Sequence, residues 1–206
     1  MKFVSRKNKN STDGFTIVET LVAVAIFSVS ISAVISVSAK GITSTTNSKN
    51  RIVANYLAQE EVEYIRHLRN KYSEAPGVAY TWADFVDLVT PCDTKTQPQT
   101  MCAIADPTIF NPATTTQTTE VFKCQNLDEC QDYPVYLDTN GYFYQSSLAG
   151  TGTATIFHRY FTVEINPTNK NEVKLIASVF WKERNNAEKN VTLTETLTNW
   201  LPVSTP

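Results

Sequence analysis

The chain has 206 residues, 42% of them hydrophobic, which is enough to bury one moderate core and leaves little room for a second domain. Its formal net charge of −2 hides an uneven distribution. The first 14 residues carry four basic side chains and one acid, so the remainder has 14 basic against 19 acidic residues. An acidic body of this kind disfavours general binding to the phosphate backbone of nucleic acids.

A long apolar segment, "FTIVETLVAVAIFSVSISAVISVSA", occupies residues 15–39 and contains a single charged residue, Glu19. As a helix it would be about 37 Å long, enough to cross a hydrocarbon core of about 30 Å with some tilt. A carboxylate inside a membrane helix costs about 2.5–3.5 kcal/mol at the centre and less near an end, so it marks a function. Because residues 15–39 contain no Lys, Arg or His, the partner of Glu19 must come from elsewhere.

A signal peptide, a buried core helix and a plain membrane anchor are the alternatives for the apolar segment. A secretory signal peptide has a passable cleavage site after Ala39, but its apolar part should be only about 7–15 residues long. A buried core helix of this length would find too little protein around it, and a plain membrane anchor fits everything except Glu19. The leader is denser in basic residues than the stretch after Ala39, so we expect the leader on the cytoplasmic side.

The junction "DGFTIVE" at residues 13–19 places a Gly immediately before a Phe, with an acid four residues farther on, behind a short basic leader. This arrangement resembles the type III signal of type IV pilins and pseudopilins. The resemblance implies cleavage between Gly14 and Phe15 by the prepilin peptidase, N-methylation of Phe15 and assembly into a filament. It implies as partners this peptidase/methyltransferase, an inner-membrane assembly platform, other pilin or pseudopilin subunits and, before assembly, the lipid bilayer.

Cleavage would give Glu19 a partner. The new α-amine has a pKa near 8 and lies at a helix N-terminus, where positive charge is unfavourable. In a stack of such helices this amine can approach Glu19 of a neighbouring subunit, and the attraction at about 4 Å is about 4 kcal/mol before desolvation. We therefore expect Glu19 to form an assembly salt bridge. The spacing of Ser28, Ser32 and Ser36 would also permit close approach of helices.

The fold expected is α+β, with a long N-terminal helix packed on an antiparallel sheet of about four strands, as in pilins. We expect a cleaved leader at residues 1–14, a stalk helix at 15–72 with a transmembrane part at about 15–39, and an extracytoplasmic head at 73–206. The stretch around Gly41 is poor in helix formers, which predicts a bend or a locally melted segment. The protein would lie in the inner membrane with a single pass, then in a surface pilus or a periplasmic pseudopilus.

The four cysteines are Cys92, Cys102, Cys124 and Cys130. Their even number, and their place after the apolar segment, favour disulfides in an oxidising compartment. Zinc sites require closer pairs such as CxxC, so metal ligation and free thiols are the weaker alternatives. The connectivity stays open, although pairing of sequence neighbours would contribute about 2–3 kcal/mol per bridge.

The sequence of the head, residues 73–206, predicts mostly strands. Residues 80–90 form a short helix or strand, residues 91–120 read as loop, and residues 159–200 predict three antiparallel strands. Residues 134–145 predict a hairpin with a type I′ turn at Asn140-Gly141. Asp138 and Asn140 could mimic part of a calcium loop, but a full set of acidic ligands is missing, so a plain turn is favoured and no cofactor is expected.

The residues that most enzymes need are missing. There are only two histidines, and the sequence contains no GxSxG, HExxH or CxxC motif and no phosphate-binding Gly loop, so we expect no enzyme. The closing "TETLTNW" and "NYLAQEEVEYIRHLRN" loosely resemble PilV-like minor pilins and the minor pseudopilin I of type II secretion, which favours a minor subunit. The competing hypotheses are a secretion pseudopilin and an uncleaved, membrane-anchored extracellular binding or sensor domain.

Overall fold

The computed structural model describes residues 14–74, 81–98, 100–104, 121–125, 129–130, 132–145, 152–183 and 186–199. The leader at residues 1–13, Pro76, Gly77 and Trp200 lie outside the described residues. The chain divides into two compact units, residues 1–48 and residues 49–206. Each unit is described by itself.

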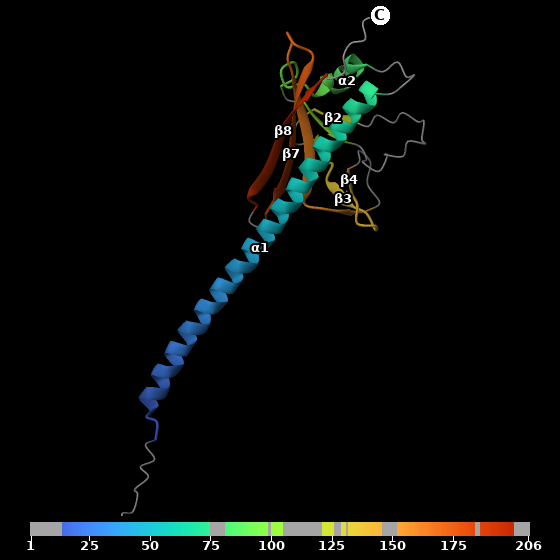
Figure 1. The fold of residues 1–206 in the computed structure, drawn as a ribbon. Coiled ribbons are helices and arrows are strands. Elements are labelled where there is room, and N and C mark those ends of the chain that lie inside the picture. The colour runs from blue at the N-terminus through green and yellow to red at the C-terminus, as the bar shows by residue number, and fades with distance from the viewer. Residues whose placement is uncertain are drawn as a thin grey trace, which may run out of the picture. The chain divides into compact units, whose positions relative to one another are not determined.

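A single α-helix, α1 (Ile17–Glu74), runs through the first unit and continues into the second (Figure 1). The prediction of a locally melted segment at Gly41 is therefore wrong. Three threonines in this region, Thr43, Thr45 and Thr46, donate their hydroxyls to the carbonyl four residues earlier. Their poor helix propensity amounts to fractions of a kcal/mol each, which helical neighbours on both sides can outweigh.

The second unit is built on a five-stranded antiparallel sheet with the order β2-β1-β6-β7-β8. Its strands are β1 (Met101–Ile104), β2 (Val121–Cys124), β6 (Phe157–Ile165), β7 (Glu172–Lys182) and β8 (Glu188–Thr198). The last three form the predicted meander, whose strands pair in register over nine and eleven residues. The first two are short. The expectation of loop over residues 91–120 is thus wrong at 101–104, while residues 105–120 lie outside the described part.

A second, three-stranded sheet has the order β4-β3-β5, from β3 (Val135–Leu137), β4 (Phe143–Gln145) and β5 (Thr153–Ala154). With this sheet, the described strands exceed the predicted four. The hairpin β3–β4 confirms the one expected at 134–145. Its turn differs from the prediction, because only Gly141 has a positive φ there (88°), whereas a type I′ turn requires positive φ at both central residues.

Residues 49–74 of α1 cover one face of the five-stranded sheet (Figure 1). An apolar stripe of the helix, which recurs at helical spacing in the sequence, is buried there: Ala54, Leu57, Ala58, Val62, Ile65 and Leu68. The odd-numbered residues of β7 meet this stripe, since successive side chains of a strand point to opposite faces. The short segment at 80–90 is a helix, α2 (Trp82–Val89), followed by the 3-10 turn η1 (Thr90–Cys92). The α+β fold is therefore as predicted.

Candidate assembly site

The first turn of α1 contains the predicted cleavage junction and the predicted assembly acid. The helix begins at Ile17, and the backbone N–H of Glu19 donates to the hydroxyl of Thr16 at 3.3 Å. Thr16 and Glu19 have the Thr-x-x-Glu spacing of a capping box. The negative charge of Glu19 also lies near the positive end of the helix dipole, where a carboxylate is stabilising. Gly14 and Phe15 precede the helix and are exposed, so the backbone at the junction lies outside the helical hydrogen-bond network.

Helix α1 is long and apolar enough to cross a membrane, by length and composition, and none of its most apolar window is buried by the described residues. Large apolar side chains from Phe15 to Val37 are exposed all round the helix. An all-round apolar surface is what a lipid bilayer or other apolar helices can cover. The structure thus provides no protein core around this segment among the residues that it describes.

The serines of this segment have satisfied hydroxyl groups. Ser28, Ser32 and Ser36 each donate to the backbone carbonyl four residues earlier, at 2.8–2.9 Å. Hydrogen bonds of this kind leave no unpaired donor on the side chain, which lowers the cost of placing serine in hydrocarbon. The predicted small-residue stripe is therefore compatible with an apolar environment.

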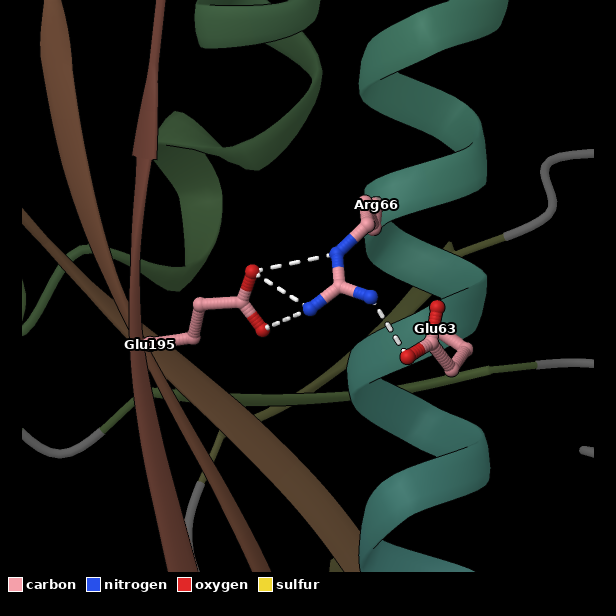
Figure 2. Close-up of polar contacts among 3 residues, drawn as sticks. All are labelled: Glu63, Arg66 and Glu195. Atoms are coloured by element: carbon pink, nitrogen blue, oxygen red, sulfur yellow. Dashed lines mark hydrogen bonds and ion pairs between the residues drawn. The ribbon is translucent and has the colours of Figure 1, made fainter.

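In the head, an ion-pair cluster joins α1 to β8, the edge strand of the five-stranded sheet (Figure 2). The guanidinium of Arg66 donates to both carboxylate oxygens of Glu195 in β8, at 2.7 Å, and lies 2.5 Å from Glu63 one turn earlier in α1. The bonds to Glu195 raise the pKa of Arg66 above its usual value. A two-oxygen contact of this geometry fixes the helix against the strand more specifically than a single-point contact does.

Part of this cluster can be read from the sequence. Glu63 lies three residues before Arg66 and four before His67, and in the structure it pairs with Arg66. Glu195 is a charge in the register of β8 that Val191, Leu193 and Leu197 otherwise occupy, but the sequence does not identify its partner. That position on the helix-facing side was the available signal, because an acid there requires a cation from the element packed against it.

A second polar group is buried deeper between α1 and the sheet. Arg159 of β6 is 1% exposed, and its Nη1 lies 3.2 Å from Glu60. The neighbouring Glu61 is fully buried, and neither of its carboxylate oxygens accepts a hydrogen bond from the described residues. Burial raises the pKa of Glu61 to about 8, opposed by Arg159 and reinforced by Glu60. Sequence reasoning missed Glu61, although it lies four residues from both Leu57 and Ile65 on the buried stripe.

All four cysteines form disulfides, and the structure decides their pairing. Cys92 at the end of η1 pairs with Cys102 of β1, and Cys124 of β2 pairs with Cys130. All four are buried. Both bridges join sequence neighbours, and each closes a short loop worth about 2–3 kcal/mol in chain entropy.

The hairpin turn uses the Asp138 carboxylate internally. Its Oδ1 accepts the backbone N–H groups of Asn140 and Tyr142, at 2.8 and 2.7 Å, and these bonds lower the pKa of Asp138. No cluster of three or more metal-binding side chains occurs in the part of the chain that the structure describes. The Asp138 carboxylate thus stabilises the turn through backbone hydrogen bonds.

Comparison with known proteins gives one match at the N-terminus. The family model described as the prokaryotic N-terminal methylation motif matches residues 9–35. The match supports the type IV pilin and pseudopilin family. It contains the junction at Gly14-Phe15, Glu19 and the first part of the exposed apolar helix of this pilin-like protein. The motif and the α+β fold together point to a structural protein.

No curated protein and no solved structure matches the pilin-like chain.

Proposed function

We propose that this protein is a subunit of a type IV pilus or a related pseudopilus. It is cut between Gly14 and Phe15, methylated at Phe15 and assembled through the apolar helix. The observation that carries the proposal is that the methylation motif at residues 9–35 overlaps an exposed, all-round apolar segment at residues 15–39 whose single acid is Glu19. No ordinary anchor needs an acid at that place.

Assembly follows from the charges that cleavage creates. Before the cut, Glu19 lies near the positive end of the helix dipole, and no ion pair involving it occurs among the described residues. After the cut, the methylated amine of Phe15 is positive and lacks an acceptor. A neighbouring helix brings an amine and a carboxylate together in a medium of low dielectric, where the attraction offsets the cost of having placed Glu19 in lipid.

The route of the chain follows from the same features. The helix first lies in the inner membrane through about residues 15–39, with the leader inside and the head outside. The peptidase/methyltransferase acts on the cytoplasmic side, and an assembly platform transfers the subunit into a filament beside other subunits. The disulfides support an extracytoplasmic head, because such bridges persist in oxidising compartments.

Within this function we propose a minor subunit, on the loose resemblance of "NYLAQEEVEYIRHLRN" and "TETLTNW" to minor pilins. A secretion pseudopilus is the second candidate, because the same segments also resemble a minor pseudopilin. Co-purification decides between them: the subunit should be found in surface pili that remain when the secretion machinery is deleted.

The test of the main proposal is mass spectrometry of the N-terminus on sheared filaments. A chain that begins at methylated Phe15 is expected. An intact leader would overturn the proposal in favour of an uncleaved anchored domain, and a chain that begins after Ala39 would indicate a secreted protein. The matched control is the same measurement on the membrane fraction of cells that lack the peptidase, where the leader should remain.

A further inference from the structure

An asparagine is followed two residues later by a threonine at three places in the sequence: "NST" at 10–12, "NPT" at 166–168 and "NVT" at 190–192. The pattern Asn-x-Ser/Thr is the acceptor for N-glycosylation in exported proteins, provided that x is not proline. Pro167 therefore excludes the second place. In the proposed function the first lies in the leader, on the cytoplasmic side, so Asn190 is the candidate that remains.

The structure presents the acceptor side chains of this pattern together on one face of β8. Asn190 and Thr192 are both exposed, and the side-chain amide of Asn190 makes no hydrogen bond with the described residues. Because side chains alternate along a strand, these two point to the face opposite to α1, whereas Val191 between them packs into the core. An enzyme that approaches the outer face therefore meets the amide and the threonine hydroxyl side by side.

The backbone at Asn190 is accessible as well, because β8 is the last strand in the sheet order. Asn199 donates its N–H to the carbonyl of Asn171, which is the residue opposite to it in the register. Hydrogen-bonded and non-hydrogen-bonded pairs alternate in an antiparallel ladder, so the pair of Asn190 with Phe180 is non-hydrogen-bonded. The N–H and C=O of Asn190 thus point away from β7, where an enzyme can bind them.

The excluded pattern at residues 166–168 differs in its local structure and provides a natural comparison. The Oδ1 atom of Asn166 accepts the backbone N–H groups of Thr168 and Asn169, at 2.9 and 3.3 Å. This asparagine is exposed too, but its side chain is used to stabilise the turn between β6 and β7. Exposure is therefore common to both places, and the proline and the bonded side chain distinguish Asn166.

A glycan at Asn190 also suits the position of β8 in the sheet. The strand pairs with β7 over eleven consecutive residues and contains no proline, and residues 190–198 contain no lysine. Proteins usually protect such a long edge from pairing with other strands by prolines, lysines or bulges. A glycan is bulky and solubilising, so at Asn190 it would hinder the addition of a strand at this end of the edge.

We propose that Asn190 is the acceptor of an N-linked glycan. This inference rests on the proposed function, because an extracytoplasmic head is on the side where a membrane transferase can use a lipid-linked glycosyl pyrophosphate as the donor. A bond forms between Nδ2 of Asn190 and the anomeric carbon of the first sugar, and the bond from that carbon to the pyrophosphate oxygen breaks. The lipid pyrophosphate leaves, and a base of the transferase accepts one proton from Nδ2.

Thr192 provides the second group that the transferase recognises. Its hydroxyl oxygen lies 3.2 Å from the hydroxyl oxygen of Ser178 on the neighbouring strand, and the residue remains exposed. A hydroxyl held on the same face as the amide can exchange this contact for one with the enzyme. The inference therefore requires both Asn190 and the hydroxyl of Thr192.

The experiment is mass spectrometry of the full-length protein isolated from the cells that produce it. A protease that cleaves after glutamate releases residues 189–195, which contain Asn190, and residues 165–172, which contain Asn166. The first peptide should carry the additional mass of one or more sugars, and fragmentation should assign that mass to Asn190. The second peptide, from the same digest, is the control and should carry none.

Three variants check what the transferase recognises. Asn190→Gln and Thr192→Val should each abolish the additional mass, since the first lacks the acceptor and the second keeps the β-branched shape without the hydroxyl. Thr192→Ser keeps the hydroxyl and should keep the modification. Both positions are exposed, so the fold should be retained, which circular dichroism verifies. Equal loss in Thr192→Val and Thr192→Ser would contradict the inference.

Several results for the wild-type protein would overturn the inference. An unmodified peptide 189–195 rejects it, and so does a sugar that fragmentation places on a threonine of that peptide. A sugar at Asn166 would show that the Asn-x-Thr pattern is not what selects the acceptor. If Asn190 is unmodified while the mature chain begins at methylated Phe15, the proposed function stands and only this inference fails. If Asn190 carries the glycan on a chain with an intact leader, the inference stands and the filament function fails.

Discussion

Glu61 and Glu195 both lie on the helix–sheet interface, but their environments differ. Glu195 accepts bonds from Arg66 and keeps a quarter of its side chain exposed (26%), so it is a paired carboxylate. Glu61 is fully buried and accepts no hydrogen bond from the described residues, so its neutral form is favoured. Burial therefore raises the pKa of Glu61, whereas Glu195 has Arg66 as a hydrogen-bonded cationic partner.

The first prediction concerns pH. The unfolded chain loses the Glu61 proton near the ordinary value of 4.5, whereas the folded chain keeps it up to about 8. Between these values the folded state binds the extra proton, so this residue's contribution to stability is complete below pH 4.5 and is lost as the pH rises to 8. We expect Glu61→Gln to have the thermal midpoint of the wild type at pH 4.5 and a higher one at pH 8.

The measurement is thermal unfolding by circular dichroism of the full chain in detergent between pH 4.5 and 9. Each 1 kcal/mol corresponds to about 2–4 °C at this size. The control is Asp87→Asn, an exposed acid of α2, which should leave the difference between the two pH values unchanged. A Glu61→Gln midpoint at pH 8 that does not exceed the wild type would contradict the prediction.

The second prediction compares the two carboxylates on Arg66. Glu195→Gln should lower the free energy of unfolding by about 1 kcal/mol, because it weakens a two-oxygen, partly buried contact. Glu63→Gln, which affects the exposed contact within α1, should cost about 0.3 kcal/mol. Urea unfolding of both variants measures the difference, and equal losses would show that the helix–strand contact adds nothing beyond a surface pair.

At the scale of elements, the long periodic ones were predictable and the short ones were not. The stripe of α1 and the alternation in β6, β7 and β8 are local patterns that a core on one side imposes. Strand β1 has only four residues, and it exists because β2 and β6 pair with it from distant parts of the chain. The predicted melting at Gly41 failed for the opposite reason, since cooperative helix on both sides outweighed weak local preference.

The third prediction concerns the disulfides, which tie the short elements to the sheet. Replacing Cys92 and Cys102 by alanine, or Cys124 and Cys130, should each cost about 2–3 kcal/mol from loop entropy alone. The first pair lies in the main core beside Phe85 and Phe161, whereas the second lies in a small separate cluster. We therefore expect the larger loss for the first pair in urea unfolding, and an equal or smaller loss would show that core packing at Cys92 adds little.

At the scale of the whole molecule, the two units contribute different parts of the proposed function. The first contains an apolar helical segment with one acid, and the second contains a folded head with two disulfides. In the proposed function, contacts between apolar helices assemble the subunit, and the disulfide-bonded head lies outside the membrane.

The fourth prediction tests the helix contact. Glu19→Ala should still be cut and methylated, because the junction at Gly14 and Phe15 is unchanged, but it should remain in the membrane and be absent from sheared filaments. Removing the carboxylate eliminates the attraction to the amine of the neighbouring subunit. The readout is immunoblotting of both fractions, with Thr20→Ala as a control that keeps the charge. Normal amounts of Glu19→Ala in filaments would contradict the assigned role.

The sequence by itself determined the features that neighbouring residues encode: the methylation segment with its junction and acid, the apolar helix, the head stripe of α1 and the three long strands. Only the tertiary structure decided the disulfide pairing, the order of the sheet, the partner of Glu195 and the burial of Glu61. Periodicity and short motifs act over a few residues, whereas Arg66 and Glu195 lie 129 residues apart in the chain. Such contacts form only when distant segments pack into one core, so no local pattern in either segment predicts them.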